Sequence, residues 1–229
     1  MIEYLFLDLD DTILDFHKAE HIALGKTLRE FGIEPTQTVL DRYTQINQLH
    51  WQRLERGEIT REQVKRGRFA VLFDELGVQA DPALVTAAYE KHLAVGHYFL
   101  PGAQEALNNL RGKYRLFLAS NGTAHVQAGR LTSAGLYPFF EQVFVSEEMG
   151  HNKPSKAYFD ACFARIPGFD PGKAMIVGDS LTSDILGGKN AGIATCWVNP
   201  AHRPPRPDII PDYEIPALSA LEALLETLD

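Results

Sequence analysis

Five short apolar runs constrain the fold of this chain more than any other part of its sequence. Each run has four or five residues, does not alternate with polar residues, and is followed by a turn or a polar segment; the runs span 4–7, 115–119, 142–145, 174–177 and 194–198. Such runs are typical of strands that are buried on both faces of a parallel sheet. Helical patterns separate the later runs, at 103–112, 126–135 and 156–166. Strand and helix therefore alternate, which predicts a doubly wound α/β core.

A long segment between the first two runs gives no strand signal. From 16 to 99 the sequence shows only helical patterns, roughly four of them, and Thr60 followed by Gln63 resembles a capping box at the start of one helix. We therefore expect residues 1–15 and 100–229 to form the α/β core and residues 16–99 to form an inserted, all-helical domain.

The region beyond the fifth run gives weaker signals. Residues 202–213 are rich in proline and read as a surface connection. Residues 219–228 have an amphipathic pattern, which predicts a closing helix.

The composition limits the partners that such a fold could take. The 229 residues carry a formal net charge of −8, which argues against nucleic acid as a partner because a basic face would be needed. No apolar run approaches the length of a membrane span, and no basic leader or cleavage site is visible. Cys162 and Cys196 lie in apolar surroundings without metal-ligand spacing, so we expect buried, reduced thiols. We expect a cytoplasmic protein without a membrane partner, present as a monomer or a small homo-oligomer.

Three aspartates follow directly on the first apolar run, in the stretch LFLDLDDTI. Asp8, Asp10 and Asp11 repel one another there and lose hydration. If Asp8 ends a strand, the following turn can aim Asp8 and Asp10 at one point while Thr12 anchors the turn. A nucleophilic carboxylate, a second carboxylate for proton transfer and a bound cation would account for this arrangement. The alternative is a solvated acidic turn.

Two further polar clusters follow the second and third runs. Ser120, Asn121 and Gly122 offer a hydroxyl, an amide and backbone N–H groups that could hold phosphate oxygens, although a simple turn is the alternative. Lys153, which precedes a proline, could neutralise both a carboxylate nucleophile and a phosphate, although a solvated lysine is the alternative.

A fourth cluster follows the run at 174–177. Asp179 and Asp184 bring two more carboxylates to the end of that strand, and carboxylate oxygens suit Mg²⁺. A helix N-cap and a solvated aspartate are the alternatives. Because the carboxyl ends of parallel strands meet at one edge of a sheet, the four clusters together predict a site for Mg²⁺ and phosphate.

The order of these clusters resembles the four motifs of the haloacid dehalogenase-like hydrolase superfamily, here DLDDT, LFLASNG, Lys153-Pro154 and GDSLTSD. The helical segment resembles the family's cap by its position between the first two motifs. The resemblance implies a Rossmann-like core in which Asp8 is a nucleophile that forms an aspartyl-phosphate. It also implies that Asp10 protonates the leaving oxygen and then activates water.

The same resemblance implies further roles at the site. Ser120 and Lys153 would bind phosphate and take part in catalysis, with Asp11, Thr12, Asn121 and Gly122 as further phosphate contacts. Mg²⁺ would be held by Asp8, Asp179 and the backbone carbonyl of Asp10, with Asp184 supporting the metal site indirectly or through water.

Three longer stretches resemble a narrower group, the bacterial pyrimidine nucleoside 5′-monophosphate phosphatases. They are WQRLERGEIT with RGRF, RLTSAGLYPFFEQVFVSEEMGHNKP, and SDILGGKNAGIATCWVN. This implies a small phosphomonoester substrate, in particular a nucleoside monophosphate. Trp51 is our candidate for a contact with the base, because aromatic faces stack on bases, and packing between cap helices is its alternative role.

Other reactions of the superfamily remain open from the motifs. They are hydrolysis of another phosphometabolite such as a sugar phosphate or phosphoglycolate, phosphomutase activity, and 2-haloacid dehalogenation. A module that binds without catalysis is a further alternative, against which the intact set of reactive residues weighs. A halide leaves without a proton, so Asp10 would have no task in a dehalogenase. The motifs therefore favour phosphoryl transfer.

Overall fold

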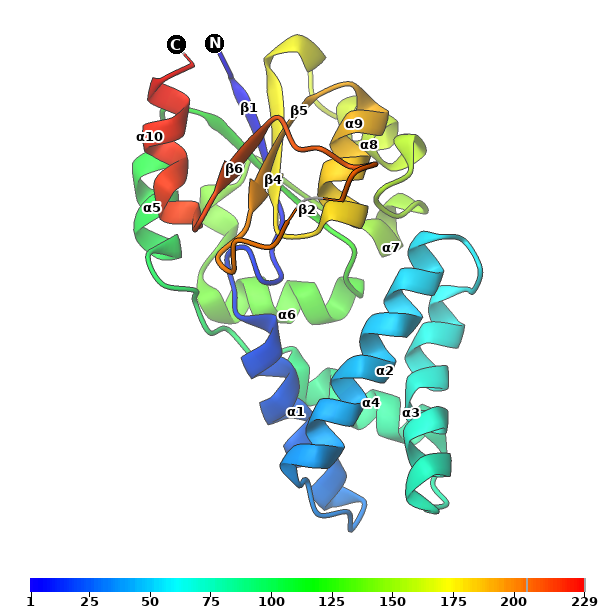
Figure 1. Ribbon diagram of the computed structural model, residues 1–229. Coiled ribbons are helices and arrows are strands. Elements are labelled where there is room, and N and C mark those ends of the chain that lie inside the picture. The colour runs from blue at the N-terminus through cyan, green and yellow to red at the C-terminus, as the bar shows by residue number, and fades with distance from the viewer. Residues whose placement is uncertain (205, 229) are drawn as a thin grey trace.

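The computed structural model describes residues 1–204 and 206–228 of the chain, and a six-stranded sheet lies at its centre (Figure 1). Every pair of neighbouring strands is parallel. The strand order is β3-β2-β1-β4-β5-β6. The strands are β1 (Tyr4–Leu7), β2 (Arg115–Ser120), β3 (Gln142–Val145), β4 (Ala174–Gly178), β5 (Ala194–Val198) and β6 (Tyr213–Ile215). The predicted doubly wound α/β fold is confirmed.

Helices cover both faces of this sheet. Successive residues of a strand point to opposite faces, so Leu5 and Leu7 of β1 pack with one helix layer while Tyr4 and Phe6 pack with the other. The first layer is formed by α5 (Ala103–Leu110), α6 (Ala124–Ala134) and α10 (Leu221–Glu226). The second is formed by α7 (Ser146–Met149), α8 (Lys156–Phe163) and α9 (Leu186–Ala191).

Short helical turns join several of these elements. A π-helical turn, η3 (Leu181–Ile185), connects β4 to α9 and carries Asp184. The 3₁₀ turns are η1 (Tyr137–Phe139), η2 (Pro171–Lys173) and η4 (Leu218–Ala220).

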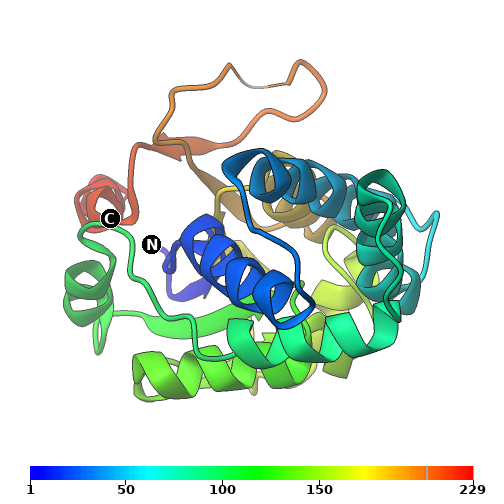
Figure 2. The same ribbon diagram turned by 90° about the horizontal axis from the view of Figure 1, so that it is seen from below.

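Four helices form the predicted insertion between β1 and β2. They are α1 (Phe16–Glu30), α2 (Gln37–Glu55), α3 (Arg61–Leu76) and α4 (Pro82–Leu93). Their buried side chains form a second core around Tyr43, Phe69 and Tyr89, which Val126 of α6 joins. The capping box of Thr60 and Gln63 is present at the start of α3. Figure 2, seen from the side of the insertion, shows these helices in front of one edge of the sheet.

The chain passes between the α/β core and the helical insertion twice, and these two crossings lie side by side. The N–H of Asp15 donates to the carbonyl of Tyr98 at 2.7 Å, and the N–H of Leu100 donates to the carbonyl of Ile13 at 3.0 Å. The two chain connections of the insertion therefore lie together, directly beside the carboxyl end of β1.

The C-terminal region differs from the sequence expectation in two respects. The strand β6 was not predicted, because three residues at a sheet edge are too short to give a period. The closing helix expected at 219–228 is shorter, with η4 preceding α10. Pro205, in the segment expected to be a surface connection, lies outside the described residues.

The two cysteines are buried and free, as expected. Burial raises the pKa of the Cys162 and Cys196 thiols to about 12, so both are protonated and unreactive near neutral pH. Among the described residues, no helix has the length and apolar character needed to cross a bilayer.

Candidate active site

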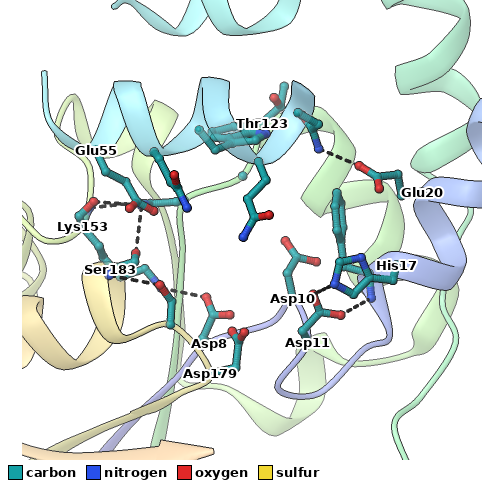
Figure 3. A pocket seen from close by; sticks show the side chains of 18 of the residues that line it. Asp8, Asp10, Asp11, His17, Glu20, Glu55, Thr123, Lys153, Asp179 and Ser183 are labelled. Atoms are coloured by element: carbon teal, nitrogen blue, oxygen red, sulfur yellow. Dashed lines mark hydrogen bonds and ion pairs between the residues drawn. The ribbon is translucent and has the colours of Figure 1, made fainter. Parts of the chain in front are cut away.

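The predicted polar clusters meet at the carboxyl edge of the sheet, where the direction of strand addition reverses. Asp8 follows β1 and Asp179 follows β4, and these two strands are neighbours. The N–H of Asp8 donates to the carbonyl of Val177 at 3.0 Å, which continues the β1–β4 pairing as far as the aspartate. Ligands of doubly wound sheets bind at this switch point. Figure 3 shows the carboxylates of Asp8 and Asp179 next to each other there.

Lys153 joins two of these clusters. Its Nζ donates to Asp8 Oδ1 at 2.7 Å, to Asp184 Oδ1 at 2.6 Å and to the carbonyl of Ala119 at 2.6 Å. The ammonium has three donors, so all of them are satisfied although the side chain is only 1% exposed. Burial alone would lower the pKa of Lys153, but the carboxylates of Asp184 and Asp8 outweigh it and raise that pKa.

Burial disfavours the ionised form of the carboxyl groups around this lysine. Loss of hydration raises the pKa of Asp8 to about 8, an effect that Lys153 opposes and that Asp184 and Asp10 increase. Burial also raises the pKa of Asp179 well above its usual value, and repulsion from Asp184 and Asp8 raises it further. One ammonium therefore leaves the negative charge of this cluster only partly neutralised.

The donor set fits a hard divalent cation. Asp8, Asp179 and Asp184 each offer a carboxylate oxygen, and these atoms lie within 4.8 Å of one another. Mg²⁺ prefers such oxygens, and its charge would offset both the loss of hydration and the repulsion that raise the pKa values of Asp8 and Asp179. Asp184 already accepts from Lys153 through Oδ1 and from the Ser180 N–H through Oδ2 at 3.1 Å. Asp8 and Asp179 therefore have the freer oxygens for a metal.

The carboxylate of Asp10 is held by α6. It accepts from Gln127 Nε2 at 2.7 Å and pairs with Nη1 of Arg130, whose side chain is fully buried. Our sequence analysis did not identify Gln127 or Arg130. Both lie in a segment that was predicted correctly to be helical. The signal that could have identified them is their spacing: two polar residues three positions apart share one helix face, beside the apolar Val126 and Leu131.

Ser120 is the last residue of β2 and Asn121 follows it, and both side chains have partners in the protein. The Oγ of Ser120 accepts from the Gly122 N–H at 3.2 Å and from Gln127 Nε2 at 2.8 Å. Asn121 accepts from the Lys153 N–H at 2.8 Å and donates to the Lys153 carbonyl at 2.9 Å. The carboxamide of Asn121 therefore fixes the backbone of the lysine. Gly122 is needed beside it, because a Cβ there would lie 2.3 Å from Gln127 Nε2.

Asp11 and Thr12 are engaged elsewhere in the turn. Asp11 has a φ of 57°, its N–H donates to the carbonyl of Leu14 at 2.8 Å, and its Oδ1 accepts from the Phe16 N–H at 2.9 Å. Its carboxylate also lies 3.5 Å from His17 Nε2, and burial raises its pKa to about 6. Thr12 is buried, and its hydroxyl has no hydrogen-bond partner among the described residues. Phosphate contacts from these two side chains gain no support from this arrangement.

A cavity of about 320 Å³ separates the carboxyl edge of the sheet from the helical insertion. On the core side it is lined by Asp8, Asp10, Lys153 and Asp179, among others. On the opposite side, one face of α2 lines it with residues spaced three or four apart: Thr44, Asn47, Gln48, Trp51, Gln52 and Glu55. Trp51 therefore faces the cavity, and its contact with a base stays a prediction.

Several polar contacts join the insertion to the core beside the cavity, and Arg61 and Glu55 make two of them. Arg61 at the start of α3 donates to the carbonyls of Asn121 and Gly122 at 3.0 and 2.9 Å. Its other nitrogen donates to Ser146 Oγ at 2.6 Å and to Asn152 Oδ1 at 2.5 Å.

Glu55, at the end of α2, forms the second contact by accepting from Thr182 Oγ1 at 3.0 Å. Burial raises the pKa of Glu55 to about 7, an effect that this hydrogen bond opposes.

A buried network supports the cavity face of α2. Glu20 of α1 accepts from Thr44 Oγ1 and from Asn47 Nδ2, both at 2.6 Å. Nη1 of Arg68 on α3 donates to Asn47 Oδ1 at 2.9 Å. Asn47 is thereby fixed in orientation, whereas Gln48 and Gln52 on the same face are more exposed.

Comparisons with known proteins agree with this geometry. The model of the haloacid dehalogenase-like hydrolase family matches residues 2–192. The chain is 44% identical to YfnB of Bacillus subtilis (96% of this chain, 94% of the relative). It is 38% identical to the pyrimidine 5′-nucleotidase PynA of Streptococcus pneumoniae (99% and 95%) and 33% identical to the pyrimidine 5′-nucleotidase YjjG of Escherichia coli (97% and 97%).

The three-dimensional comparison gives the same result. A crystal structure of YfnB bound to magnesium, which reveals interdomain movement, superposes with a TM-score of 0.93. That match has 43% sequence identity and covers 98% of both chains.

Proposed function

This chain belongs to the haloacid dehalogenase-like hydrolase family, and we propose that it hydrolyses phosphomonoesters with Mg²⁺ through an aspartyl-phosphate on Asp8. The observation that carries this proposal is the buried Lys153 bridging Asp8 and Asp184, within the carboxylate cluster that includes Asp179. A lysine held there lets an anionic nucleophile approach an anionic phosphate.

In the proposed first step, an oxygen of Asp8 attacks phosphorus and the bond to the leaving oxygen breaks. Asp10 gives its proton to that oxygen, so the product leaves as an alcohol. In the second step Asp10 takes a proton from water, which attacks the aspartyl-phosphate and releases inorganic phosphate and free Asp8. Lys153 stays in contact with Asp8 and offsets the charge that develops on the phosphoryl oxygens.

We propose that Asp8, Asp179 and the backbone carbonyl of Asp10 hold the metal, while Asp184 acts mainly by orienting Lys153. Mg²⁺ would supply charge neutralisation and polarise the phosphate oxygens. Ser120 is the proposed hydroxyl contact to phosphate, released for this purpose from its bonds to Gln127 and Gly122.

We propose a nucleoside 5′-monophosphate, in particular a pyrimidine nucleotide, as the substrate. Two relatives that align with nearly the whole chain are named pyrimidine 5′-nucleotidases. The cavity face of α2 is compatible with a base, because Trp51 offers a ring for stacking and Gln48 and Gln52 offer carboxamides that both donate and accept.

We further propose that residues 16–99 act as a cap that opens to admit substrate. The relative YfnB shows interdomain movement. The adjacent crossings of this chain suit a hinge, and Arg61 and Glu55 would hold the cap against the core when it closes.

The test is phosphate release from a panel of phosphomonoesters, with Mg²⁺ and with EDTA, for the wild type and Asp8→Asn. The panel contains UMP, dUMP, dTMP, purine monophosphates, sugar phosphates and phosphoglycolate. We expect Mg²⁺-dependent release that is fastest with pyrimidine nucleotides and is lost in Asp8→Asn.

Each alternative reaction predicts a different outcome of this test. A preference for sugar phosphates or phosphoglycolate would overturn the nucleotide assignment and keep the mechanism. No release from any ester, together with isomerisation of glucose 1-phosphate or halide release from 2-chloropropionate, would overturn the phosphatase itself. Absence of all three reactions would leave the binding-module alternative.

A further inference from the structure

A fully buried arginine in α6 has no part in the mechanism above, although it contacts groups from three other segments. Arg130 pairs with the carboxylate of Asp10 through Nη1. Its Nε donates to the carbonyl of Gly96 at 2.9 Å, and its guanidinium lies 5.6 Å from the centre of the Phe16 ring. Nη2 of this fully buried side chain has no hydrogen-bond partner among the described residues, so the contacts of Nη1 and Nε define where the guanidinium lies.

Two of these contacts are to the chain crossings between core and cap. Phe16 begins α1 directly after the first crossing, and Gly96 lies just before the second, where Tyr98 accepts from the Asp15 N–H. Arg130 therefore touches the entry to the cap, the exit from the cap and the proposed acid/base residue with a single guanidinium.

Glycine allows the close approach of backbones at this junction. A Cβ on Gly129 would lie 2.7 Å from the carbonyl oxygen of Ala94, and one on Gly96 would lie 2.9 Å from the Cβ of Ala19. Both distances are far below ordinary carbon contacts. The end of α4 can therefore lie directly on α6, which brings the Gly96 carbonyl within reach of Arg130.

Gln127 completes the hold on Asp10 from the same face of α6. Its Nε2 donates to Asp10 Oδ2 at 2.7 Å and to Ser120 Oγ at 2.8 Å, and its Oε1 accepts from Arg130 Nη1 at 3.0 Å. Each oxygen of Asp10 thus has one partner from α6: Arg130 at Oδ1 and Gln127 at Oδ2. The carboxylate is fixed in orientation by this helix and not by its own turn.

We propose that Arg130, assisted by Gln127, is the positioning residue that aims Asp10 for proton transfer and ties its position to that of the cap. A guanidinium stays protonated, so Arg130 acts through charge and geometry and does not exchange the proton itself. Any shift of the crossings at Phe16 and Gly96 moves the guanidinium of Arg130. The orientation of the Asp10 carboxylate then changes with it. This inference rests on the proposed function, in which Asp10 is the acid and base.

The test compares two leaving groups in the first turnover. A nucleoside alkoxide is a poor leaving group and needs a proton from Asp10 to leave as an alcohol, whereas p-nitrophenolate leaves without one. For Arg130→Met and Gln127→Leu we expect first-turnover release of the nucleoside to fall by about 10²-fold, the lower range for loss of general acid catalysis. We expect release of p-nitrophenol to fall far less, and KM for the nucleotide to change little. Equal losses with both substrates would overturn the proposal.

A double variant tests whether Arg130 acts through Asp10. In an Asp10→Asn background we expect Arg130→Met to cause no further loss of first-turnover rate, because its target is already removed. Losses that multiply would show that Arg130 acts on something else. Arg130→Lys keeps the charge, so we expect it to recover part of the rate lost in Arg130→Met.

Arg115→Met is the matched control. This arginine also pairs with a carboxylate, Glu141, and its guanidinium lies 5.1 Å from the centre of the Tyr4 ring. It is the first residue of β2, however, and therefore lies at the edge of the sheet away from the site. We expect wild-type rates for it. Thermal melting identifies any variant that does not fold, and if Arg130→Met is one, Gln127→Leu decides the comparison. A wild type that hydrolyses no phosphomonoester would refute the proposed function as well, whereas an active wild type with unaffected variants would refute only this inference.

Discussion

Replacing the proposed nucleophile, Asp8, should raise the free energy of unfolding of the metal-free protein, although we expect it to abolish activity. Asp8 is 7% exposed and faces the carboxylates of Asp184 and Asp10. Its raised pKa, about 8, already includes the attraction of Lys153, so the ionised form is unfavourable in the folded state on balance. In Asp8→Asn a neutral carboxamide of nearly the same shape takes this place and can still accept from Lys153.

The size of the effect follows from the pKa shift. A rise from 3.8 to about 8 is about four units, which at about 1.36 kcal/mol per unit is a penalty on the order of 5 kcal/mol when complete. The folded state binds the proton more tightly than the unfolded chain. The penalty is therefore absent below about pH 4, grows as pH rises, and is complete above about pH 8. It amounts to roughly 2 kcal/mol at pH 5 and roughly 4 kcal/mol at pH 7.

Thermal melting in EDTA at pH 5 and pH 7 measures this difference. At about 2–4 °C per kcal/mol for a chain of this size, we expect Asp8→Asn to melt about 10 °C above the wild type at pH 7 and about half as far above it at pH 5. Added Mg²⁺ should raise the Tm of the wild type more than that of the variant, because a bound ion stabilises only the state that binds it.

Asp74→Asn is the control, because it removes a carboxylate that is exposed on α3. We expect its Tm to follow the wild type at both pH values. A Tm of Asp8→Asn below that of the wild type would refute the electrostatic reasoning. A Tm that exceeds the wild-type value by the same margin at pH 5 and pH 7 would refute it as well.

Three other substitutions have direct readouts. Lys153→Met leaves Asp8 and Asp184 without their ammonium, so phosphate release should fall by about 10²–10³-fold; a loss below tenfold would contradict this role. Trp51→Ala should lower kcat/KM for UMP relative to glycerol phosphate by at least about fivefold, and an unchanged ratio would remove Trp51 from substrate recognition. Arg61→Gln loses most of its hydrogen bonds to the core, so amide exchange at the start of α3 should become faster, whereas unchanged exchange would show that other contacts hold the cap.

Sequence patterns identified strands β1 to β5 and the polar residues at their carboxyl ends for the same reason. A strand that is buried on both faces, such as β1, must be apolar throughout, so a charged residue directly after it marks the carboxyl edge of the sheet. Asp8 and Asp179 could be assigned to one site because parallel strands end at the same edge. The start of α3 could also be predicted, because its capping box is a local signal that lies within four residues.

Side-chain partners that depend on the packing of distant helices could not be predicted. The orientation of Asp10 is set by Gln127 and Arg130, which lie more than a hundred residues away. The carboxamide of Asn121 fixes the Lys153 backbone, although its position after a strand suggested a phosphate contact. Neither assignment can come from spacing along the chain, because partners of this kind are chosen by the packing of helices on the sheet.

The paired crossings also decide how much the core is affected by the cap. The Asp15–Tyr98 and Ile13–Leu100 hydrogen bonds close the inserted segment at its base, so the core meets a loop whose ends are already together. The entropy of closing a loop rises only with the logarithm of its length, and doubling the insertion would destabilise the core by about 0.6 kcal/mol. A core of this design can therefore exchange a large cap for a small one, or acquire an enlarged one, while the strand ends that carry the chemistry keep their geometry.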